Sequence, residues 1–222
     1  DAVKIASPAA VNTPLLRAAA TLHKPLLVST GTCELSELSP AADLLAQHAA
    51  GGCLLQCVSA YPTPNDHAAL GGIAALRDAF SLPVGYSDHT TDVWSGALAV
   101  AAGACVLEKH LTYDTSAAGP DHAASLAPDD FARYVRFARR AATMVGRRDK
   151  RVLDIEADVR NVSRQSVCAT RDLKAGHVIV RGDVTVKRPG TGIAAAKLDS
   201  VVGRRVIRDI AANDLLHEDD LA

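Results

Sequence analysis

Hydrophobic and polar positions alternate in blocks along the first two thirds of the chain. Short, nearly continuous apolar runs are each followed by a longer amphipathic segment. Such runs are typical of parallel strands that are covered on both faces. We therefore expect strands at residues 2–6, 25–29, 53–58, 83–86 and 105–107. The amphipathic segments predict helices at residues 13–23, 34–50, 66–80, 92–102 and 128–145.

Five consecutive strand–helix units predict a parallel sheet with right-handed crossovers, in the α/β class. An open doubly wound sheet and a (β/α)8 TIM barrel both satisfy this pattern. No G-x-G-x-x-G turn follows any strand, which weakens the dinucleotide-binding version of the open sheet. Polar or ionisable residues end every strand, which favours a barrel. A barrel interpretation makes these the last five units and requires about three more before Asp1.

The pattern changes after residue 146. A polar link at residues 147–163 leads into short strand-like runs at residues 166–169, 178–180, 184–187 and 201–206, with glycine turns between them. We therefore predict a partial barrel at residues 1–146, a linker at residues 147–163 and a small β-rich domain at residues 164–222. Because so small a domain is marginal alone, we expect it to dock on another surface.

The amino-acid composition argues against several classes of protein. The 222 residues are 48% hydrophobic, enough for a packed core, and a net charge of -1 gives no reason to expect a nucleic acid or an anionic membrane as partner. No apolar run approaches the roughly 20 residues that span a bilayer. The five cysteines are odd in number and most lie within apolar runs, which favours reduced thiols in a cytoplasmic protein over a disulfide framework.

Two histidines follow neighbouring predicted strands. His89 and His110 come at equivalent strand ends, where adjacent parallel strands stand about 5 Å apart. Two imidazoles at that spacing could hold Mn²⁺, Mg²⁺ or Zn²⁺, completed by substrate and water. Asp88 and Glu108 beside them are candidate supporting groups. The sequence therefore predicts a metal site at this edge of the sheet.

One ammonium and three hydroxyls would surround the same barrel mouth. They belong to Lys4, Ser7, Ser59 and Ser87. This set suits an anion that carries phosphate or carboxylate, although strand-end serines also cap helices.

Lys109 supports a rival mechanism, because a buried barrel lysine can form a Schiff base with a carbonyl substrate. Alternation along the strand puts Glu108 and His110 on one face and Lys109 on the other, which favours the metal site. A non-catalytic carbohydrate-binding protein is a third hypothesis.

Six short motifs stand in order at the predicted strand ends: Lys4–Ser7, Ser29–Gly31, Cys57–Pro64, Gly85–Thr90, Glu108–Thr112 and Gly119–His122. Together they resemble the signature of the sialic acid (N-acetylneuraminate) synthase family. Residues 164–222, with Lys187–Gly190, are similar to that family's C-terminal antifreeze-like SAF domain. The resemblance covers essentially the whole chain.

The resemblance implies a PEP-dependent, carbon–carbon bond-forming transferase of sialic acid biosynthesis. Phosphoenolpyruvate would condense with an N-acetylated amino sugar such as N-acetylmannosamine to give a nine-carbon 2-keto acid and phosphate. His89 and His110 would bind the metal, most often Mn²⁺. It also implies that the first three units of the barrel are absent, and it leaves open whether the remaining five are active alone.

Further roles follow only from the resemblance. Lys4, Ser7, Ser59 and Ser87 match positions that hold phosphoenolpyruvate. Tyr61 and Asp121 match sugar-contacting positions, and Glu108 supports the metal-side chemistry. Family dimers are domain-swapped, so that Arg188 of one chain would reach the sugar's N-acyl group over the barrel mouth of its partner.

Two departures from the family pattern concern the sugar. Ser7-Pro8-Ala9 replaces a frequent Ser-Gly-Glu, and Ser59 stands where sialic acid enzymes often carry asparagine. Legionaminic and pseudaminic acid synthases, which use other modified sugars, are therefore alternatives.

Overall fold

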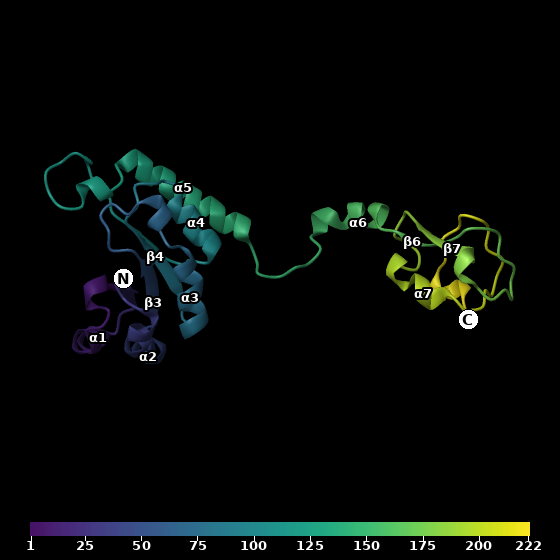
Figure 1. Cartoon of the computed structure of the whole chain (residues 1–222), viewed down its shortest axis with the longest axis horizontal. Helices are drawn as coiled ribbons and strands as arrows, with labels where there is room; N and C mark the ends of the chain where they lie inside the picture. Colours follow the sequence, from purple (N-terminus) through teal and green to yellow (C-terminus); the bar gives the residue numbers. More distant parts are fainter. The chain divides into compact units, whose positions relative to one another are not determined.

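Five parallel strands form one sheet in the first of two units. The computed structural model describes residues 1–222, and the chain divides into Asp1–Arg148 and Asp149–Ala222. The predicted run of five parallel strands is confirmed, and neighbours in the sequence are neighbours in the sheet (Figure 1). The strands are β1 (Val3–Ile5), β2 (Leu26–Ser29), β3 (Gly52–Cys57), β4 (Val84–Asp88) and β5 (Leu107–Lys109).

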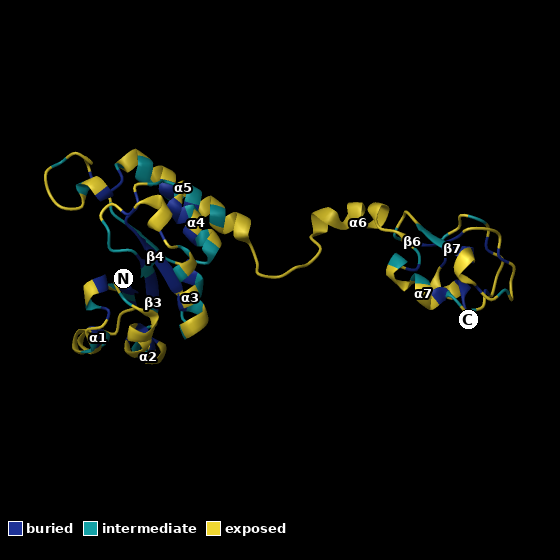
Figure 2. Cartoon of the chain, viewed as in Figure 1, coloured by how far each residue is buried: buried dark blue, intermediate teal, exposed yellow.

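Helices cover one face of this sheet (Figure 2). They are α1 (Thr13–Ala20), α2 (Ser39–Gln47), α3 (Gly71–Phe80), α4 (Ser95–Ala102) and α5 (Pro128–Val145). Alternate strand residues such as Val28, Leu54 and Val84 pack against helix residues such as Leu16 and Ile73 in one buried core. The opposite face carries the polar side chains of Lys4, Ser29, Ser87 and Glu108 beside apolar ones such as Leu27 and Leu55.

The sheet is curled into part of a barrel. β1 and β5 are its outermost strands, yet Lys4 Nζ on β1 lies 3.3 Å from Glu108 Oε2 on β5. Ser29 on β2 also donates a hydrogen bond to Glu108 Oε2, at 3.4 Å. A flat sheet would keep these side chains well apart, since neighbouring strands are about 4.8 Å apart. The predicted partial TIM barrel is therefore confirmed, and its polar side is the concave face.

Helix ends follow local chemistry, and three predicted starts were too early. The helix expected from residue 92 begins at Ser95. The helix expected from residue 34 begins with a 3₁₀ turn at Leu35–Leu38 before α2. The one expected from residue 66 begins only at Gly71, because Ala69 adopts a positive φ of 49°. Both bounds of α5 were predicted correctly, since proline and two acidic residues start it and Gly146 ends it.

The second unit is a small β-rich fold with its own core. Inside the segment predicted as a linker, Ala157–Ser163 forms a short helix, α6. β6 (Ser166–Ala169) and β7 (Val184–Lys187) then form an antiparallel pair, and Leu198–Val201 forms α7. Its core contains Val167, Leu173, Ile179, Ile210 and Leu216.

Two strands predicted in this unit were wrong. Residues 201–206 begin at the end of α7, and Val206 makes only an isolated bridge to Leu221. Residues 178–180 likewise contribute one bridge, between Val178 and Arg205. Isolated bridges need no period-two run, so alternation in the sequence could not separate them from strands. None of the chain's helices combines the length and apolarity needed to cross a membrane.

A buried carboxylate holds the second unit together. Asp183 accepts hydrogen bonds from Arg171 Nε at 2.8 Å, His177 Nε2 at 2.6 Å and Val180 N at 3.0 Å. Burial raises the pKa of Asp183, but these donors outweigh it and lower that pKa to about 2. The folded pKa of Asp183 lies below the ordinary value of about 3.9. The stabilisation that its ionised carboxylate contributes is therefore complete above about pH 3.9 and is lost as the pH falls through about 2.

We therefore expect Asp183→Asn to destabilise the second unit by about 1–3 kcal/mol at neutral pH. Hydrogen exchange of peptides covering β6 and β7 measures this loss, and the difference from wild type should shrink in strong acid. Asp209→Asn is the control, since that carboxylate pairs with Lys174 and accepts from Ala175 N in solvent and is expected to contribute much less than the buried Asp183. Equal protection in both variants would contradict the prediction.

Candidate active site

The concave face gathers polar side chains from all five strands. Register pairs Cys57 of β3 with Ser87 of β4, and Ser87 with Glu108 of β5. Lys4 of β1 and Ser29 of β2 reach the same Glu108 carboxylate. Each of these residues alternates with a core residue on its strand, which is why they share one side. The curl of the sheet therefore brings these polar side chains close together on its concave face.

Two imidazoles lie side by side where β4 and β5 end. The ring centroids of His89 and His110 are 5.2 Å apart, with the planes nearly perpendicular. The ring of Tyr61 lies 4.2 Å from that of His89 and 6.1 Å from that of His110. Tyr61 is half exposed, so the group is open to a ligand from solvent.

One nitrogen of each imidazole is already engaged. His89 Nδ1 lies 2.9 Å from the Val58 carbonyl oxygen, so that Nδ1–H donates and Nε2 keeps its lone pair. His110 Nδ1 lies 3.9 Å from Asp121 Oδ2, close enough for electrostatic orientation though too long for a hydrogen bond. Asp121 adopts a positive φ of 67°, an uncommon backbone conformation for aspartate that is often found at functional sites.

This donor set fits a labile divalent ion. Both imidazoles present Nε2 at neighbouring strand ends, and a carbonyl or a carboxylate orients the other nitrogen of each, as is usual for metal-bound histidine. No group of three or more histidine, cysteine, aspartate or glutamate side chains has metal-site geometry. Two protein ligands leave most of the coordination sphere to substrate and water.

A small cradle lies on the same face. The Gly31 N–H donates to Ser7 Oγ at 3.0 Å. A Cβ at Gly31 would lie 2.9 Å from Ser7 Oγ, 3.1 Å from Cys57 Sγ and closer still to Ser59 Oγ. The Ser59 hydroxyl is buried and has no hydrogen-bond partner. A buried hydroxyl without a partner is costly unless a ligand satisfies it, which indicates an anion or another polar group here.

Cys57 is a member of this cluster that the sequence did not single out. Its Sγ lies 3.4 Å from Ser7 Oγ and 3.8 Å from His89 Nδ1. Burial raises the pKa of Cys57, but contacts with His89 and Ser7 outweigh it, so this pKa lies below its ordinary value. Burial lowers the pKa of His89, and Cys57 and Val58 reverse that shift to give a raised pKa. In the sequence, the one sign that this thiol lies near the site is that Cys57 begins the motif Cys57–Pro64.

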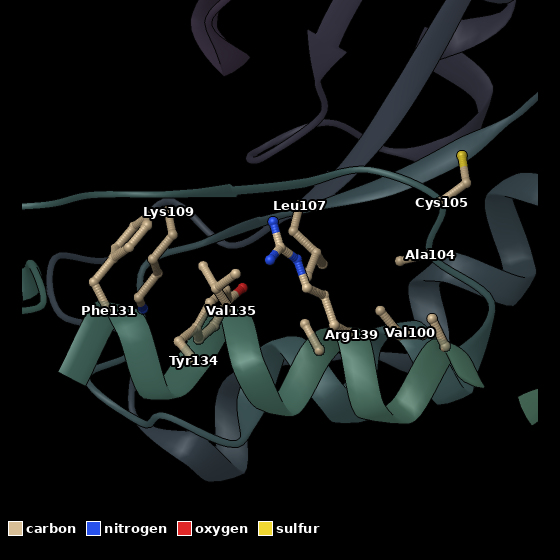
Figure 3. Close-up of a pocket in the computed structure, with 11 residues that line it drawn as sticks. Val100, Ala104, Cys105, Leu107, Lys109, Phe131, Tyr134, Val135 and Arg139 are labelled. Atoms are coloured by element: carbon tan, nitrogen blue, oxygen red, sulfur yellow. The ribbon is translucent and has the colours of Figure 1, made fainter. Parts of the chain in front are cut away.

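Lys109 lies on the opposite side of the sheet. Its ammonium is 3.3 Å from Asp88 Oδ1 and 5.6 Å from the ring centroid of Tyr134 on α5. Burial lowers the pKa of Lys109, and Asp88 partly offsets that shift. Figure 3 shows Lys109 extending toward α5 in a pocket of about 440 Å³ between β5 and the helices. Asp88 also faces the helices, where it pairs with Lys109 and not with either imidazole, so its role as a supporting group of a metal site stays a prediction.

The remaining predicted residues divide between the units. Glu108 contacts Lys4 and Ser29, whereas no hydrogen bond joins it to either histidine. Ser87 is buried on β4 beside the cluster. Arg188 lies in the second unit, directly after β7. The first unit therefore brings together nine of the ten predicted site residues: Lys4, Ser7, Ser59, Tyr61, Ser87, His89, Glu108, His110 and Asp121.

Comparison with known proteins identifies relatives along the whole chain. A N,N'-diacetyllegionaminic acid synthase of Legionella pneumophila is 39% identical over 219 residues, covering 96% of this chain and 62% of the relative. A crystal structure of a putative spore coat polysaccharide biosynthesis protein E from Chromobacterium violaceum covers 100% of this chain and 68% of that one, with a TM-score of 0.81 and 30% identity.

A third relative carries the sialic acid name. The crystal structure of an N-acetylneuraminic acid (sialic acid) synthetase from Leptospira borgpetersenii in complex with citrate is 34% identical, with a TM-score of 0.66 over 70% of this chain and 55% of that one. The chain thus spans about 62% of the length of the Legionella relative.

Family models match both units. Residues 1–150 match the NeuB family, and residues 164–222 match the SAF domain. Both matches agree with the resemblance drawn from the six strand-end motifs and the small C-terminal domain. The chain therefore belongs to the NeuB family and ends in a SAF domain.

Proposed function

We propose that the protein carrying this chain is a nonulosonic acid synthase that condenses phosphoenolpyruvate with an N-acetylated amino sugar. The observation that carries the proposal is the concave face itself. There, the unpartnered Ser59 hydroxyl and the Gly31 cradle lie on the same surface as two imidazoles with free Nε2 atoms. The cradle suits a phosphorylated carboxylate, and the two imidazoles suit a metal ion that polarises a carbonyl group. Synthases of legionaminic and neuraminic acid among the relatives support the reaction class.

Lys4, Ser7, Ser59 and Ser87 bind phosphoenolpyruvate in this proposal. The Lys4 ammonium supplies the positive charge, and the serine hydroxyls donate hydrogen bonds to phosphate and carboxylate oxygens. Lys4 is only partly exposed and already pairs with Glu108, so a bound anion shares an ammonium that is fixed in place. Such preorganisation lowers the cost of orienting the enol carbon toward its acceptor.

In this proposal His89 and His110 would hold a divalent ion, Mn²⁺, which when bound supplies Lewis-acid polarisation of the sugar aldehyde. Asp121 keeps the His110 ring in place, and its exposed side also offers an acceptor to sugar hydroxyls. Tyr61 packs against His89 with its ring tilted by 38° and presents a phenol to the same space. C3 of phosphoenolpyruvate then attacks the aldehyde carbon, water adds at C2, and phosphate leaves by cleavage of the C–O bond.

Glu108 is the group we assign to proton transfer or water orientation. Its carboxylate stands between the Lys4 ammonium and the Ser29 hydroxyl on the concave face. A carboxylate within reach of both halves of the site can accept a proton from the water that adds at C2.

The amino sugar is either N-acetylmannosamine or a diacetamido-dideoxy sugar. The 39% identity to a legionaminic acid synthase favours the second, as do Ala9 and Ser59, which replace residues frequent in sialic acid enzymes. Pseudaminic acid synthesis is the remaining alternative within this class.

A Schiff-base aldolase that uses Lys109 is less well supported. A nucleophilic lysine must reach the substrate carbonyl, but this ammonium is buried against Asp88 and α5 on the far side of the sheet. A non-catalytic carbohydrate-binding role also leaves the paired imidazoles without a purpose.

The proposal also covers the oligomeric state and the cellular location of the protein. We infer a domain-swapped homodimer in which the SAF domain of one chain covers the concave face of another, with Arg188 near the sugar's N-acyl group. The exposed side chain of Arg188 and the exposed aliphatic side chains of α6 are available for such an arrangement. Free cysteines and the use of phosphoenolpyruvate favour the cytoplasm.

A substrate panel tests the function. The protein expressed from its complete coding sequence is mixed with Mn²⁺, phosphoenolpyruvate and either N-acetylmannosamine or a diacetamido-dideoxy hexose. We expect one sugar to give stoichiometric phosphate and keto acid, and EDTA to stop the reaction. Phosphate release that ignores both the sugar and the chelator would refute the assignment, and a borohydride-trapped pyruvate adduct on Lys109 would support the aldolase instead.

A further inference from the structure

A buried ion pair links β4 and β5 directly behind the two imidazoles. Asp88 and Lys109 are register partners on these neighbouring strands, and His89 and His110 are the next residues along each strand. Because side chains alternate, the ion pair faces the helices while the histidines face the concave surface. The spacing of the imidazoles thus depends on the same two backbone segments that the ion pair joins.

Asp88 has a full set of partners. Oδ1 accepts from Thr90 N at 2.8 Å and from Lys109 Nζ at 3.3 Å, and Oδ2 accepts from Ser95 Oγ at 2.5 Å. Lys109 Nζ also donates to the Thr90 carbonyl oxygen. The residues on both sides of His89 are therefore anchored, and Lys109 ties them to the strand that leads into His110. The concave-face contacts described above include none of these atoms.

Stability alone does not explain this arrangement. The side chains of Asp88 and Lys109 are 0% and 1% exposed, and desolvating each charge costs several kcal/mol. Apolar residues of similar volume are often as stabilising in such a place, and the neighbours Leu107, Phe131 and Val135 would suit them (Figure 3). An apolar side chain could not donate to the Thr90 carbonyl, however, so the charges contribute a defined backbone geometry.

We propose that Asp88 and Lys109 are positioning residues whose buried ion pair holds the ends of β4 and β5 in register and thereby fixes the separation of the His89 and His110 imidazoles. The inference deepens the proposed function, because that separation decides whether one ion can be shared. Neither residue touches substrate. Each acts through the histidine that follows it.

The test neutralises the pair without leaving a lone buried charge. In the chain labelled with ¹⁵N-histidine, the perpendicular rings 5.2 Å apart should give a nuclear Overhauser effect between His89 and His110 ring protons in the absence of metal. We expect Lys109→Met combined with Asp88→Asn to abolish this effect, and Mn²⁺ affinity measured by electron paramagnetic resonance to fall about tenfold or more. Ser95→Ala is a milder change, because it removes only one hydrogen bond to Asp88. It should weaken the nuclear Overhauser effect and lower the Mn²⁺ affinity to a smaller extent.

Controls separate positioning from folding and from the function itself. Neutralising the exposed pair Asp130 and Arg133 on α5 should leave the ring contact and Mn²⁺ affinity unchanged. If Lys109→Met with Asp88→Asn unfolds the first unit, Ser95→Ala alone decides the outcome. An unchanged ring contact in a folded variant would overturn the positioning role. Absence of Mn²⁺ binding in wild type with an intact, pair-dependent ring contact would instead refute the metal site alone.

Discussion

Replacement of His89 or His110 by alanine is expected to lower the rate of keto acid formation by about 10²–10³-fold, because a polarising ion is worth several kcal/mol of barrier. Each variant removes one of two imidazoles whose centroids lie 5.2 Å apart, and one imidazole alone holds an ion weakly. The loss should therefore appear in kcat and in Mn²⁺ affinity, with little change in the KM for phosphoenolpyruvate.

The control for the histidine variants is His67→Ala. His67 lies in the first unit and is exposed, and its imidazole pairs with the neighbouring Asp66. We expect full activity from that variant. If His89→Ala and His110→Ala retained wild-type activity in metal-depleted buffer, the two imidazoles would have no metal role, whatever the reaction.

Gly31→Ala is expected to raise the KM for phosphoenolpyruvate by about 10–100-fold while the fold remains intact. The added methyl would lie 2.9 Å from Ser7 Oγ and closer to Ser59 Oγ, so both hydroxyls must turn away from the cradle. Overpacking of this kind costs about 1–3 kcal/mol, and here that cost falls on ligand binding. Steady-state kinetics at saturating sugar measure the effect.

Gly71→Ala is the matched control, because a Cβ there meets no atom within 4 Å and its φ is not in the left-handed region. The two variants make the same chemical change in the same unit. Thermal melts should show both folded. Equal KM values for Gly31→Ala and Gly71→Ala would contradict the assignment of the cradle to phosphoenolpyruvate.

Strand positions were predictable because the fold class imposes a strong pattern. A parallel strand covered on both faces reads as a continuous apolar run, and each of the five runs overlaps an observed strand. The boundaries of α5 carried proline, acidic residues and glycine as explicit signals. The starts of α2 and α3 did not, because 3₁₀ turns share the composition of the first helical turn.

The site was predictable as far as strand ends determine it. His89 and His110 follow paired strands, so their proximity required only the order of the sheet. The contact between Lys4 and Glu108 could not be predicted, since it depends on the curl that brings the outermost strands together. Alternation placed Lys109 on the far face, but its ion pair with Asp88 was not predicted, because it depends on the register between β4 and β5.

Prediction of structure from the sequence was least successful in the small second unit. Its bridges Val178–Arg205 and Val206–Leu221 join segments by single pairs, and such pairs leave no periodic trace. The carboxylate of Asp183, which organises His177 and Arg171, lies in a turn that the sequence marked only by glycine. Networks of this kind are set by tertiary packing rather than by local propensity.

An isotope experiment tests whether phosphoenolpyruvate reacts through C3 with cleavage of its C–O bond. Phosphoenolpyruvate that carries a heavy-oxygen label in the bridge between C2 and phosphorus is turned over with Mn²⁺ and the accepted sugar, and the released phosphate is examined by mass spectrometry. Attack by C3, with water adding at C2, predicts that the label leaves with phosphate. Retention of the label in the keto acid, or turnover of free pyruvate in place of phosphoenolpyruvate, would contradict the account.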